Sequence, residues 1–128
     1  MDQKSEKYIL VVDDKKENLA LLSAIFNKFG HKYLTAQSGE ESIEIMNTHN
    51  NIGLILMDVK MKGINGTDAM KTIKKKFNIP VIAVTGFAME SDRKNLIKQG
   101  FDDFISKPID IQLLIQKIDV LLGTHNSA

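Results

Sequence analysis

Two short segments of the chain are apolar at every position, and they constrain the fold more than any other feature of the sequence. They are Ile9–Val12 and Val81–Val84. A strand that has one face in water alternates polar and apolar side chains, whereas a strand that is covered on both faces does not. The two segments therefore predict a parallel sheet that lies between two layers of helices.

Apolar runs and amphipathic stretches alternate along the chain. Strands are predicted at Tyr8–Val12, Tyr33–Ala36, Leu54–Met57, Val81–Val84 and Phe104–Ile105. In the stretches that follow each run, apolar side chains recur three and four positions apart, as on the buried face of a helix. These stretches lie at Leu19–Phe29, after the capping-box residues Ser38 and Glu41, at Met70–Phe77, at Glu90–Gly100 and at Ile111–Leu122. The repeated strand–helix order predicts an α/β fold with right-handed crossovers.

The composition fits a small globular protein and excludes several classes of function. The 128 residues include 17 Lys and Arg and 16 Asp and Glu, for a net charge of +1. We expect one domain over residues 1–128, with a core at about residues 7–123. The absence of cysteine excludes disulfides and thiolate metal sites.

The balanced charge argues against nucleic acid as a direct partner. The sequence has no long apolar segment and no signal peptide, so we expect a cytoplasmic protein that does not contact membranes.

The first polar side chains after the predicted strands form the candidate site. Asp13 and Asp14 follow the first strand, Asp58 the third, Thr85 the fourth and Lys107 the fifth. In an open parallel sheet, ligands bind beyond the carboxyl ends of the strands, at the point where the strand order reverses. We therefore expect these side chains to converge on one edge of the sheet.

This group of side chains is suited to phosphoryl chemistry. Carboxylates that lie close together repel each other, so cations must lie among them, and Lys107 supplies only one positive charge. Oxygen ligands without His or Cys select Mg²⁺, which keeps water ligands and recruits phosphate oxygens. Because an aspartate can form an acyl phosphate, we predict Asp58, which stands alone after an apolar run, as the phosphoacceptor. Asp13 and Asp14 are then the metal ligands, and Thr85 and Lys107 donate hydrogen bonds to the phosphoryl oxygens.

Each of these residues also has a purely structural interpretation. A lone Asp at a strand end commonly forms a turn or caps a helix, so Asp14 is also a candidate cap of the first helix. Thr85–Gly86 and Lys107–Pro108 are each common turn sequences. The functional interpretation depends on all of these residues falling on the same edge of the sheet.

In this order, the residues resemble the receiver domain of two-component response regulators, over about residues 7–123. The segments that carry the resemblance are Val11–Asp14, Met57–Asp58 with Gly63 and Gly66, Val84–Gly86 and Gly100–Pro108. The resemblance implies a flavodoxin-like (βα)5 three-layer sandwich with a parallel five-stranded sheet in the order 2-1-3-4-5. It also implies a cis peptide bond between Lys107 and Pro108.

Receiver domains take a phosphoryl group from a histidine kinase or a phosphotransfer protein and signal to a downstream protein. The resemblance therefore implies phosphorylation of Asp58 with Mg²⁺, and the backbone carbonyl of Lys60 as a further metal ligand. It implies that the chain is not an enzyme beyond its own phosphoryl transfer and autodephosphorylation, and that it is a monomer or weak dimer. The segment Asp14–Leu22 resembles receivers that are attached to hybrid sensor kinases. The chain departs from the family at Lys62, where relatives commonly have proline, which predicts a less stiff loop.

The resemblance assigns further residues to switching and to the lifetime of the phosphorylated state. Phosphorylation is expected to draw Thr85, beside the small Gly86, towards the phosphoryl group and to let Phe104 rotate inward. This change reshapes the face formed by the fourth helix, the fifth strand and the fifth helix. Lys60 and Phe87 are expected to flank the phosphoryl group and to slow its hydrolysis.

Other proteins with related chemistry or topology fit the sequence less well. A phosphatase of the haloacid dehalogenase type needs a second Asp two residues after its nucleophile, where this chain has Lys60. The segment Asp13–Glu17 lacks both the Ser/Thr/Gly-rich phosphate loop of flavodoxin-type proteins and the G-x-G-x-x-G of Rossmann dehydrogenases. The remaining alternative is an interaction module of the same fold that is never phosphorylated.

Overall fold

The computed structural model describes residues 7–86 and 90–123, in which strands and helices alternate. The strands are β1 (Tyr8–Val12), β2 (Tyr33–Ala36), β3 (Ile52–Asp58), β4 (Val81–Thr85) and β5 (Asp103–Ser106). The helices are α1 (Lys16–Phe29), α2 (Gly39–Thr48), α3 (Gly66–Lys74), α4 (Glu90–Gln99) and α5 (Ile111–Leu122).

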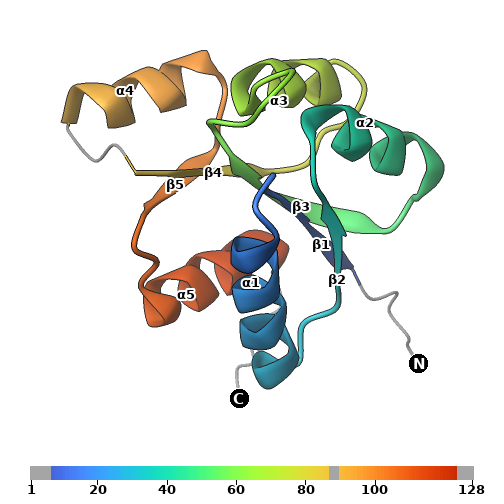
Figure 1. Cartoon of the computed structure of the whole chain (residues 1–128), viewed down its shortest axis with the longest axis vertical. Coiled ribbons are helices and arrows are strands. Elements are labelled where there is room, and N and C mark those ends of the chain that lie inside the picture. Colours follow the sequence, from blue (N-terminus) through green and yellow to red (C-terminus); the bar gives the residue numbers. More distant parts are fainter. Residues whose placement is uncertain (1–6, 87–89, 124–128) are drawn as a thin grey trace.

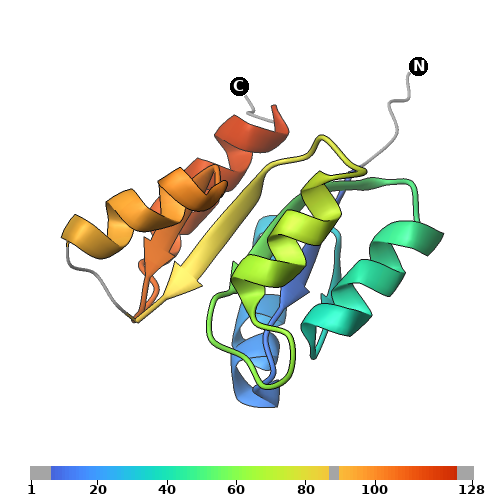
Figure 2. The same cartoon turned by 90° about the horizontal axis from the view of Figure 1, so that it is seen from above.

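The strands form one parallel sheet between two layers of helices. The strand order is β2-β1-β3-β4-β5, and every pair of neighbours is parallel. Helices α1 and α5 lie on one face of the sheet, and α2, α3 and α4 lie on the other (Figure 1). The view from above places α2, α3 and α4 in front of the sheet (Figure 2). The predicted fold class and strand order are confirmed.

The two layers explain why β1 has no polar alternation. Its side chains alternate between the two faces, as in any strand. Leu10 and Val12 belong to the core on the side of α2, α3 and α4, whereas Ile9 and Val11 belong to the core on the side of α1 and α5. Each of these side chains is at most 1% exposed, so burial on both faces requires an apolar residue at every position.

The helix ends follow local signals in the sequence. Helix α1 ends at Gly30, which adopts a left-handed conformation with φ of 78°. Ser38 caps α2, because its hydroxyl oxygen accepts a hydrogen bond from the Glu41 backbone N–H at 3.0 Å. The Glu41 carboxylate accepts from the backbone N–H of Gln37, one residue before the capping serine, at 2.7 Å. The predicted capping box is therefore present, with its second hydrogen bond shifted by one residue.

The predicted boundaries of several elements differ from the structure, including β5, which spans Asp103–Ser106 rather than Phe104–Ile105. Strand β3 begins at Ile52 and includes Asp58, and β4 includes Thr85. The ladders extend beyond the apolar runs, because Ile52 pairs with Tyr8, Asp58 with Val84 and Thr85 with Ser106. The prediction that Phe77 lies in the third helix is wrong. Helix α3 ends at Lys74, and the Phe77 N–H closes a final turn on the carbonyl of Ile73 at 2.9 Å.

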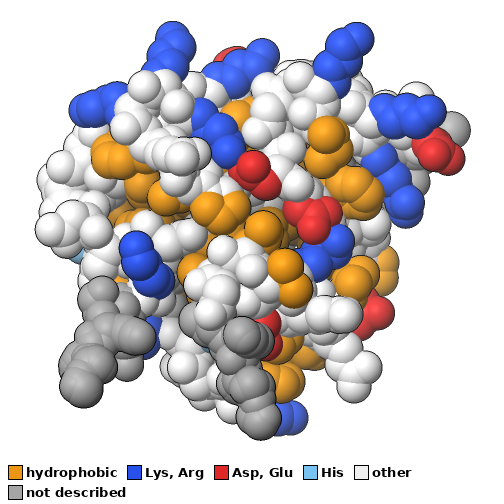
Figure 3. Space-filling model, turned by 180° about the vertical axis from the view of Figure 1, so that it is seen from behind, with side chains coloured by type: hydrophobic (Ala, Val, Ile, Leu, Met, Phe, Trp, Pro, Cys, Tyr) orange, Lys and Arg blue, Asp and Glu red, His pale blue; other side chains and the backbone are white. Residues whose placement is uncertain are grey.

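Charged side chains of both signs share the surface. On the face seen in Figure 3, Lys and Arg side chains are frequent along the upper edge, and Asp and Glu side chains lie near the centre and at the right edge, beside hydrophobic side chains. That face therefore carries both signs, as expected for a chain with a net charge of +1. Among the described residues, no helix combines the length and the apolar character that crossing a membrane requires.

The start of α3 packs directly against the end of β3, and this contact requires glycine. The Gly66 N–H donates to the carbonyl of Val59 at 3.0 Å. A Cβ atom on Gly66 would lie 2.1 Å from the carbonyl oxygen of Asp58 and 2.9 Å from the Cα of Val59. Both of these are backbone atoms that have no rotamer to change, so a side chain here must displace the end of the strand.

We predict that Gly66→Ala lowers the free energy of unfolding by about 1–3 kcal/mol, the usual cost of overpacking. Denaturant unfolding measures this change. Gly86→Ala is the matched control, because a Cβ atom there meets none of the described residues within 4 Å, and its effect should stay within about 0.5 kcal/mol. Equal effects of the two substitutions would show that the contact at Gly66 is not limiting.

Candidate functional site

The sheet register brings the predicted site residues together at the carboxyl edge. Asp13 follows β1, which pairs with β3, and Asp58 is the last residue of β3. Thr85 ends β4 and pairs with Ser106, so that Lys107 follows at the end of β5. The backbone N–H of Lys107 donates to the carbonyl of Thr85 at 2.8 Å. The predicted convergence on one edge is therefore confirmed for the side chains at the ends of β1, β3, β4 and β5.

Three carboxylates lie within reach of a single ion. One oxygen each from Asp13, Asp14 and Asp58 lie within 4.8 Å of one another. Asp13 is 3% exposed and Asp58 is 5% exposed, so their mutual repulsion is poorly screened by water. The cluster can hold a metal ion.

Both oxygens of Asp13 accept a hydrogen bond. The backbone N–H of Lys15 donates to Oδ1 at 2.9 Å, and the side-chain amide of Asn18 donates to Oδ2 at 3.0 Å. These two donors fix the orientation of the carboxylate. The bond from Lys15 is the local turn contact expected of an Asp at a strand end, so Asp13 combines this structural role with its place in the cluster.

Asp14 is held by a distant part of the chain rather than by α1. Its Oδ2 accepts from the backbone N–H of Lys62 at 3.1 Å. Its Oδ1 is buried and has no hydrogen-bond partner among the described residues. Helix α1 has Lys15 at its N-cap position, with no side-chain cap, so the alternative that Asp14 caps this helix is wrong.

Asp58 lies between cationic and anionic neighbours. Its Oδ1 accepts from the backbone N–H of Lys60 at 3.3 Å and lies 3.6 Å from the Nζ of Lys107. Burial raises the pKa of Asp58 above its ordinary value, and the charge of Asp13 raises it further. Lys107 and the Lys60 N–H lower this pKa without cancelling the increase.

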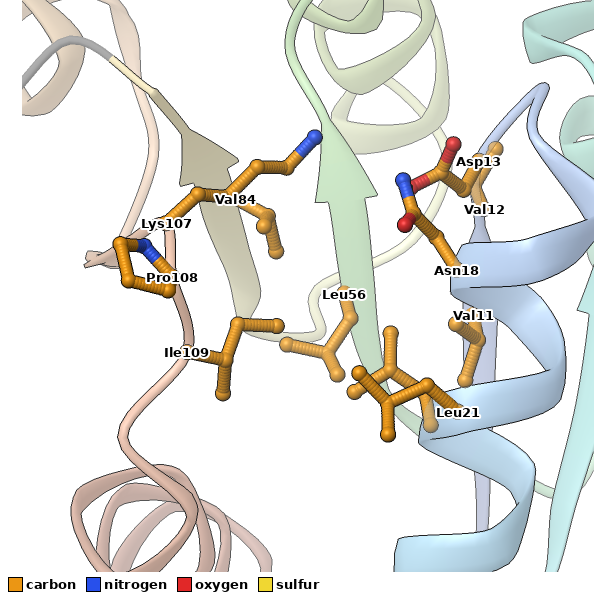
Figure 4. A pocket seen from close by; sticks show the side chains of 11 residues that line it. Val11, Val12, Asp13, Asn18, Leu21, Leu56, Val84, Lys107, Pro108 and Ile109 are labelled. Atoms are coloured by element: carbon orange, nitrogen blue, oxygen red, sulfur yellow. The ribbon is translucent and has the colours of Figure 1, made fainter.

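An open pocket adjoins the cluster on the side of α1 and α5. Its volume is about 240 Å³, and most of its lining is apolar, including Leu21, Leu56 and Ile109. Figure 4 shows the Lys107 ammonium extending across the end of β3 towards Asp13 and Asn18, with the apolar side chains at the other end. Lys107 and Asp13 are the charged residues that line the pocket, so its polar end lies at the cluster.

The residues present fit a hard divalent cation. All the side-chain ligands of the cluster are carboxylate oxygens, which is the donor set that favours Mg²⁺ over Zn²⁺. The buried Oδ1 of Asp14 provides a ligand atom that accepts no hydrogen bond from the part of the chain that the structure describes. An ion at this point would also reduce the repulsion among the three acids.

The residues assigned to switching and lifetime lie in different environments. Phe104 is partly exposed on β5, with its ring centroid 5.1 Å from the Cζ of Arg93 and 5.7 Å from the Nζ of Lys117. Gly86 and the Lys60 side chain are exposed beside the site. Phe87 lies outside the described residues, so its predicted role stays a prediction.

Sequence reasoning missed the donors that orient the acids. Asn18 lies in the first turn of α1, and its position five residues after Asp13 was the available signal. The N–H groups of Lys15, Lys60 and Lys62 carry no such signal, because every residue except proline has one.

A model of the response regulator receiver domain matches residues 9–119 of the chain. The chain belongs to this family. It is 32% identical over 120 residues to the polar-differentiation response regulator DivK of Brucella ovis, covering 91% of this chain and 97% of that protein. Among solved structures, the Francisella response regulator 1452 receiver domain is similar, with a TM-score of 0.86, 28% identity and coverage of 92% and 98% of the two chains.

A third comparison is with a Saccharomyces cerevisiae complex of a histidine phosphotransfer protein and the receiver domain of its downstream response regulator. The match has a TM-score of 0.83 and 24% identity, and it covers 92% of this chain and 90% of that one. At this identity the match supports the fold.

The Lys107–Pro108 peptide bond of the present chain is cis, so the prediction from the family resemblance is confirmed.

We predict that Asp58→Asn raises the melting temperature of the metal-free receiver domain at pH 7. The fold disfavours the charged form of Asp58, so the carboxyl stabilises the folded state only while it is protonated. Stability falls as pH rises from the ordinary pKa of 3.8 to the raised pKa of the folded state. Below this pH range the Asp58→Asn variant should therefore melt at the same temperature as wild type, which thermal unfolding at a series of pH values can measure. Glu44→Gln, at an exposed position of α2, should show no such pH-dependent gain. A lower melting temperature for Asp58→Asn at pH 7 would contradict the prediction.

Proposed function

We propose that this receiver domain accepts a phosphoryl group on Asp58 and uses it as a signal. The observation that carries the proposal is a buried carboxylate that lies beside two further acids and 3.6 Å from a lysine ammonium. In the transfer, an oxygen of Asp58 forms a bond to phosphorus while the bond from phosphorus to the donor nitrogen breaks. The product is an acyl phosphate, and the donor histidine is released unphosphorylated.

The surrounding residues have distinct roles in this proposal. Asp13 and Asp14 hold Mg²⁺, with Asp58 and the backbone carbonyl of Lys60 as further ligands. When bound, the ion neutralises charge on the transferring phosphoryl oxygens. The Lys107 ammonium donates to the same oxygens from the end of β5, close to its present position beside Asp58.

Asp58 is a better acceptor than the other two acids. Both oxygens of Asp13 accept hydrogen bonds that fix its orientation, and Asp14 is tied to the loop after β3. Asp58 instead faces the Lys107 ammonium, which is 34% exposed and reaches the mouth of the pocket. This position allows a donor to approach the carboxylate and the ammonium together.

The proposed phosphodonor is a histidine kinase or a phosphotransfer protein in the cytoplasm. A phosphotransfer protein is the partner of the yeast receiver domain in the complex described above. Leu21 is 53% exposed on α1 at the edge of the pocket, so a docking helix can bury apolar surface while its histidine reaches Asp58. The receiver domain then acts on a downstream protein and catalyses no reaction beyond its own phosphorylation and dephosphorylation.

We predict that acetyl phosphate with Mg²⁺ adds one phosphoryl group to the wild-type chain, and that Asp58→Asn abolishes this labelling. The amide has nearly the same shape as the carboxylate but is a poor nucleophile. Intact mass spectrometry detects the product, and removal of the metal with a chelator should prevent its formation. Asp68→Asn, an exposed acid on α3, is the matched control and should label like wild type. No labelling of wild type would favour the unphosphorylated interaction module, and labelling of Asp58→Asn would move the acceptor to Asp13 or Asp14.

The signal is proposed to pass from Thr85 to Phe104. Thr85 pairs with Ser106, and Ala83 pairs with Phe104, so the hydroxyl and the aromatic ring start from neighbouring positions on one face of the sheet. A hydrogen bond from the Thr85 hydroxyl to the phosphoryl group favours the state in which Thr85 has moved. Phe104 then rotates inward and changes the surface of α4, β5 and α5.

We predict that Thr85→Ala is still phosphorylated but shows smaller chemical-shift changes on α4, β5 and α5 than wild type. The methyl group cannot donate to the phosphoryl oxygens, so the coupling is lost while the acceptor remains. Two-dimensional NMR spectra with and without acetyl phosphate measure the changes. Thr72→Ala, on the exposed side of α3, should respond fully. Changes of full size in Thr85→Ala would show that the hydroxyl is not the coupling group.

A further inference from the structure

The loop between β3 and α3 contacts the acid pair through a backbone group. The Lys62 N–H donates to Oδ2 of Asp14 at 3.1 Å, although the two residues are 48 positions apart. The donor is the backbone N–H of Lys62, and the residue itself is exposed. The loop starts at the end of β3, and its far end is fixed where Gly66 packs on the Asp58 carbonyl. The N–H is therefore presented to Asp14 from a segment that is anchored at both ends.

The two oxygens of Asp14 have different environments. Oδ2 accepts the Lys62 hydrogen bond, whereas Oδ1 is buried without a hydrogen-bond partner among the described residues. The carboxylate also belongs to the cluster whose ligand atoms lie within 4.8 Å of one another. A carboxylate with a free torsion would turn away from two neighbouring acids, because like charges repel. A donor on Oδ2 opposes this rotation and keeps the carboxylate in the cluster.

We infer that the backbone N–H of Lys62 positions Asp14 for metal binding, holding Oδ2 so that Oδ1 remains available as the ligand. The inference rests on the proposed Mg²⁺ site and adds a residue to it. Groups that hydrogen-bond a ligating carboxylate orient it and raise the affinity for the metal. The relevant property of position 62 is therefore an N–H group, and the identity of the side chain is secondary.

This inference gives the departure at Lys62 a physical meaning. The family resemblance implies proline as the common residue at this position, and proline has no N–H to donate. A proline-bearing loop therefore cannot make this bond to the acid pair. In this chain Lys62 provides an N–H at that position, and its hydrogen bond links the loop after β3 to Asp14.

The test removes the N–H and measures Mg²⁺ affinity by NMR titration. Lys62→Pro removes it but also restricts the backbone. A second variant therefore replaces the amide between Met61 and residue 62 by an ester, introduced with an α-hydroxy acid, which deletes the N–H without restricting φ. Both should weaken Mg²⁺ binding by about threefold to tenfold, the range expected for the loss of one partly solvated hydrogen bond. Lys62→Ala keeps the N–H and serves as the side-chain control.

A second readout does not depend on the metal. Hydrogen exchange at the Lys62 amide should be slowed in wild type and should accelerate in Asp14→Ala, which lacks the acceptor. Unchanged Mg²⁺ affinity in the ester variant, or a loss of affinity in Lys62→Ala equal to that in Lys62→Pro, would overturn the inference. If wild type itself bound no Mg²⁺, the proposed metal site would fail first. If wild type bound Mg²⁺ and accepted the phosphoryl group while the ester variant bound equally well, only the role of Lys62 would be wrong.

Discussion

The crowding of three carboxylates at the carboxyl edge of the sheet is the constraint on which the rest of the site depends. Asp13 and Asp58 are almost fully buried, and ligand atoms of all three acids lie within 4.8 Å of one another. Like charges at this distance repel, and the pKa of Asp58 is raised first by its burial and then by the charge of Asp13. The Lys107 ammonium and several N–H donors offset part of the repulsion. The remainder favours a cation in the cluster, and in the proposed function that cation in turn attracts the oxygens of a phosphoryl group.

The fold supplies what this crowding requires. A parallel sheet brings the carboxyl ends of four strands to one edge, and its two helical layers exclude water from the strand interiors. The backbone provides most of the donors at the acids, through the N–H groups of Lys15, Lys60 and Lys62. Gly66 lets α3 start directly against β3, so the loop that carries two of these donors is closed at both ends. The anchoring of this loop and the electrostatics of the site therefore depend on the same segment of the chain.

At the surface formed by α4, β5 and α5, contacts between an aromatic ring and cations replace the crowded carboxylates. Phe104 lies between the cations of Arg93 on α4 and Lys117 on α5, and Lys117 is itself paired with Asp103 at 2.9 Å. These contacts favour the partly exposed position of the ring. The inward rotation proposed for signalling must exchange them for core contacts near Ala83. The energies of the two positions are therefore set by side chains on both helices that border the strand.

The sequence by itself determined the fold class and the main site residues, whereas the tertiary structure decided how the acids are held. Apolar strands without alternation required a sheet covered on both faces, and the first polar residues after them had to meet at one edge. The last turn of α3 could not be predicted in this way, because Phe77 continues the helical period although the helix ends at Lys74. Nor could the contacts of Asp14, since its bond to Lys62 joins backbone and side chain across 48 positions. Periodicity reports which side chains are buried, but a backbone N–H is the same in almost every residue, so only the folded chain shows where it points.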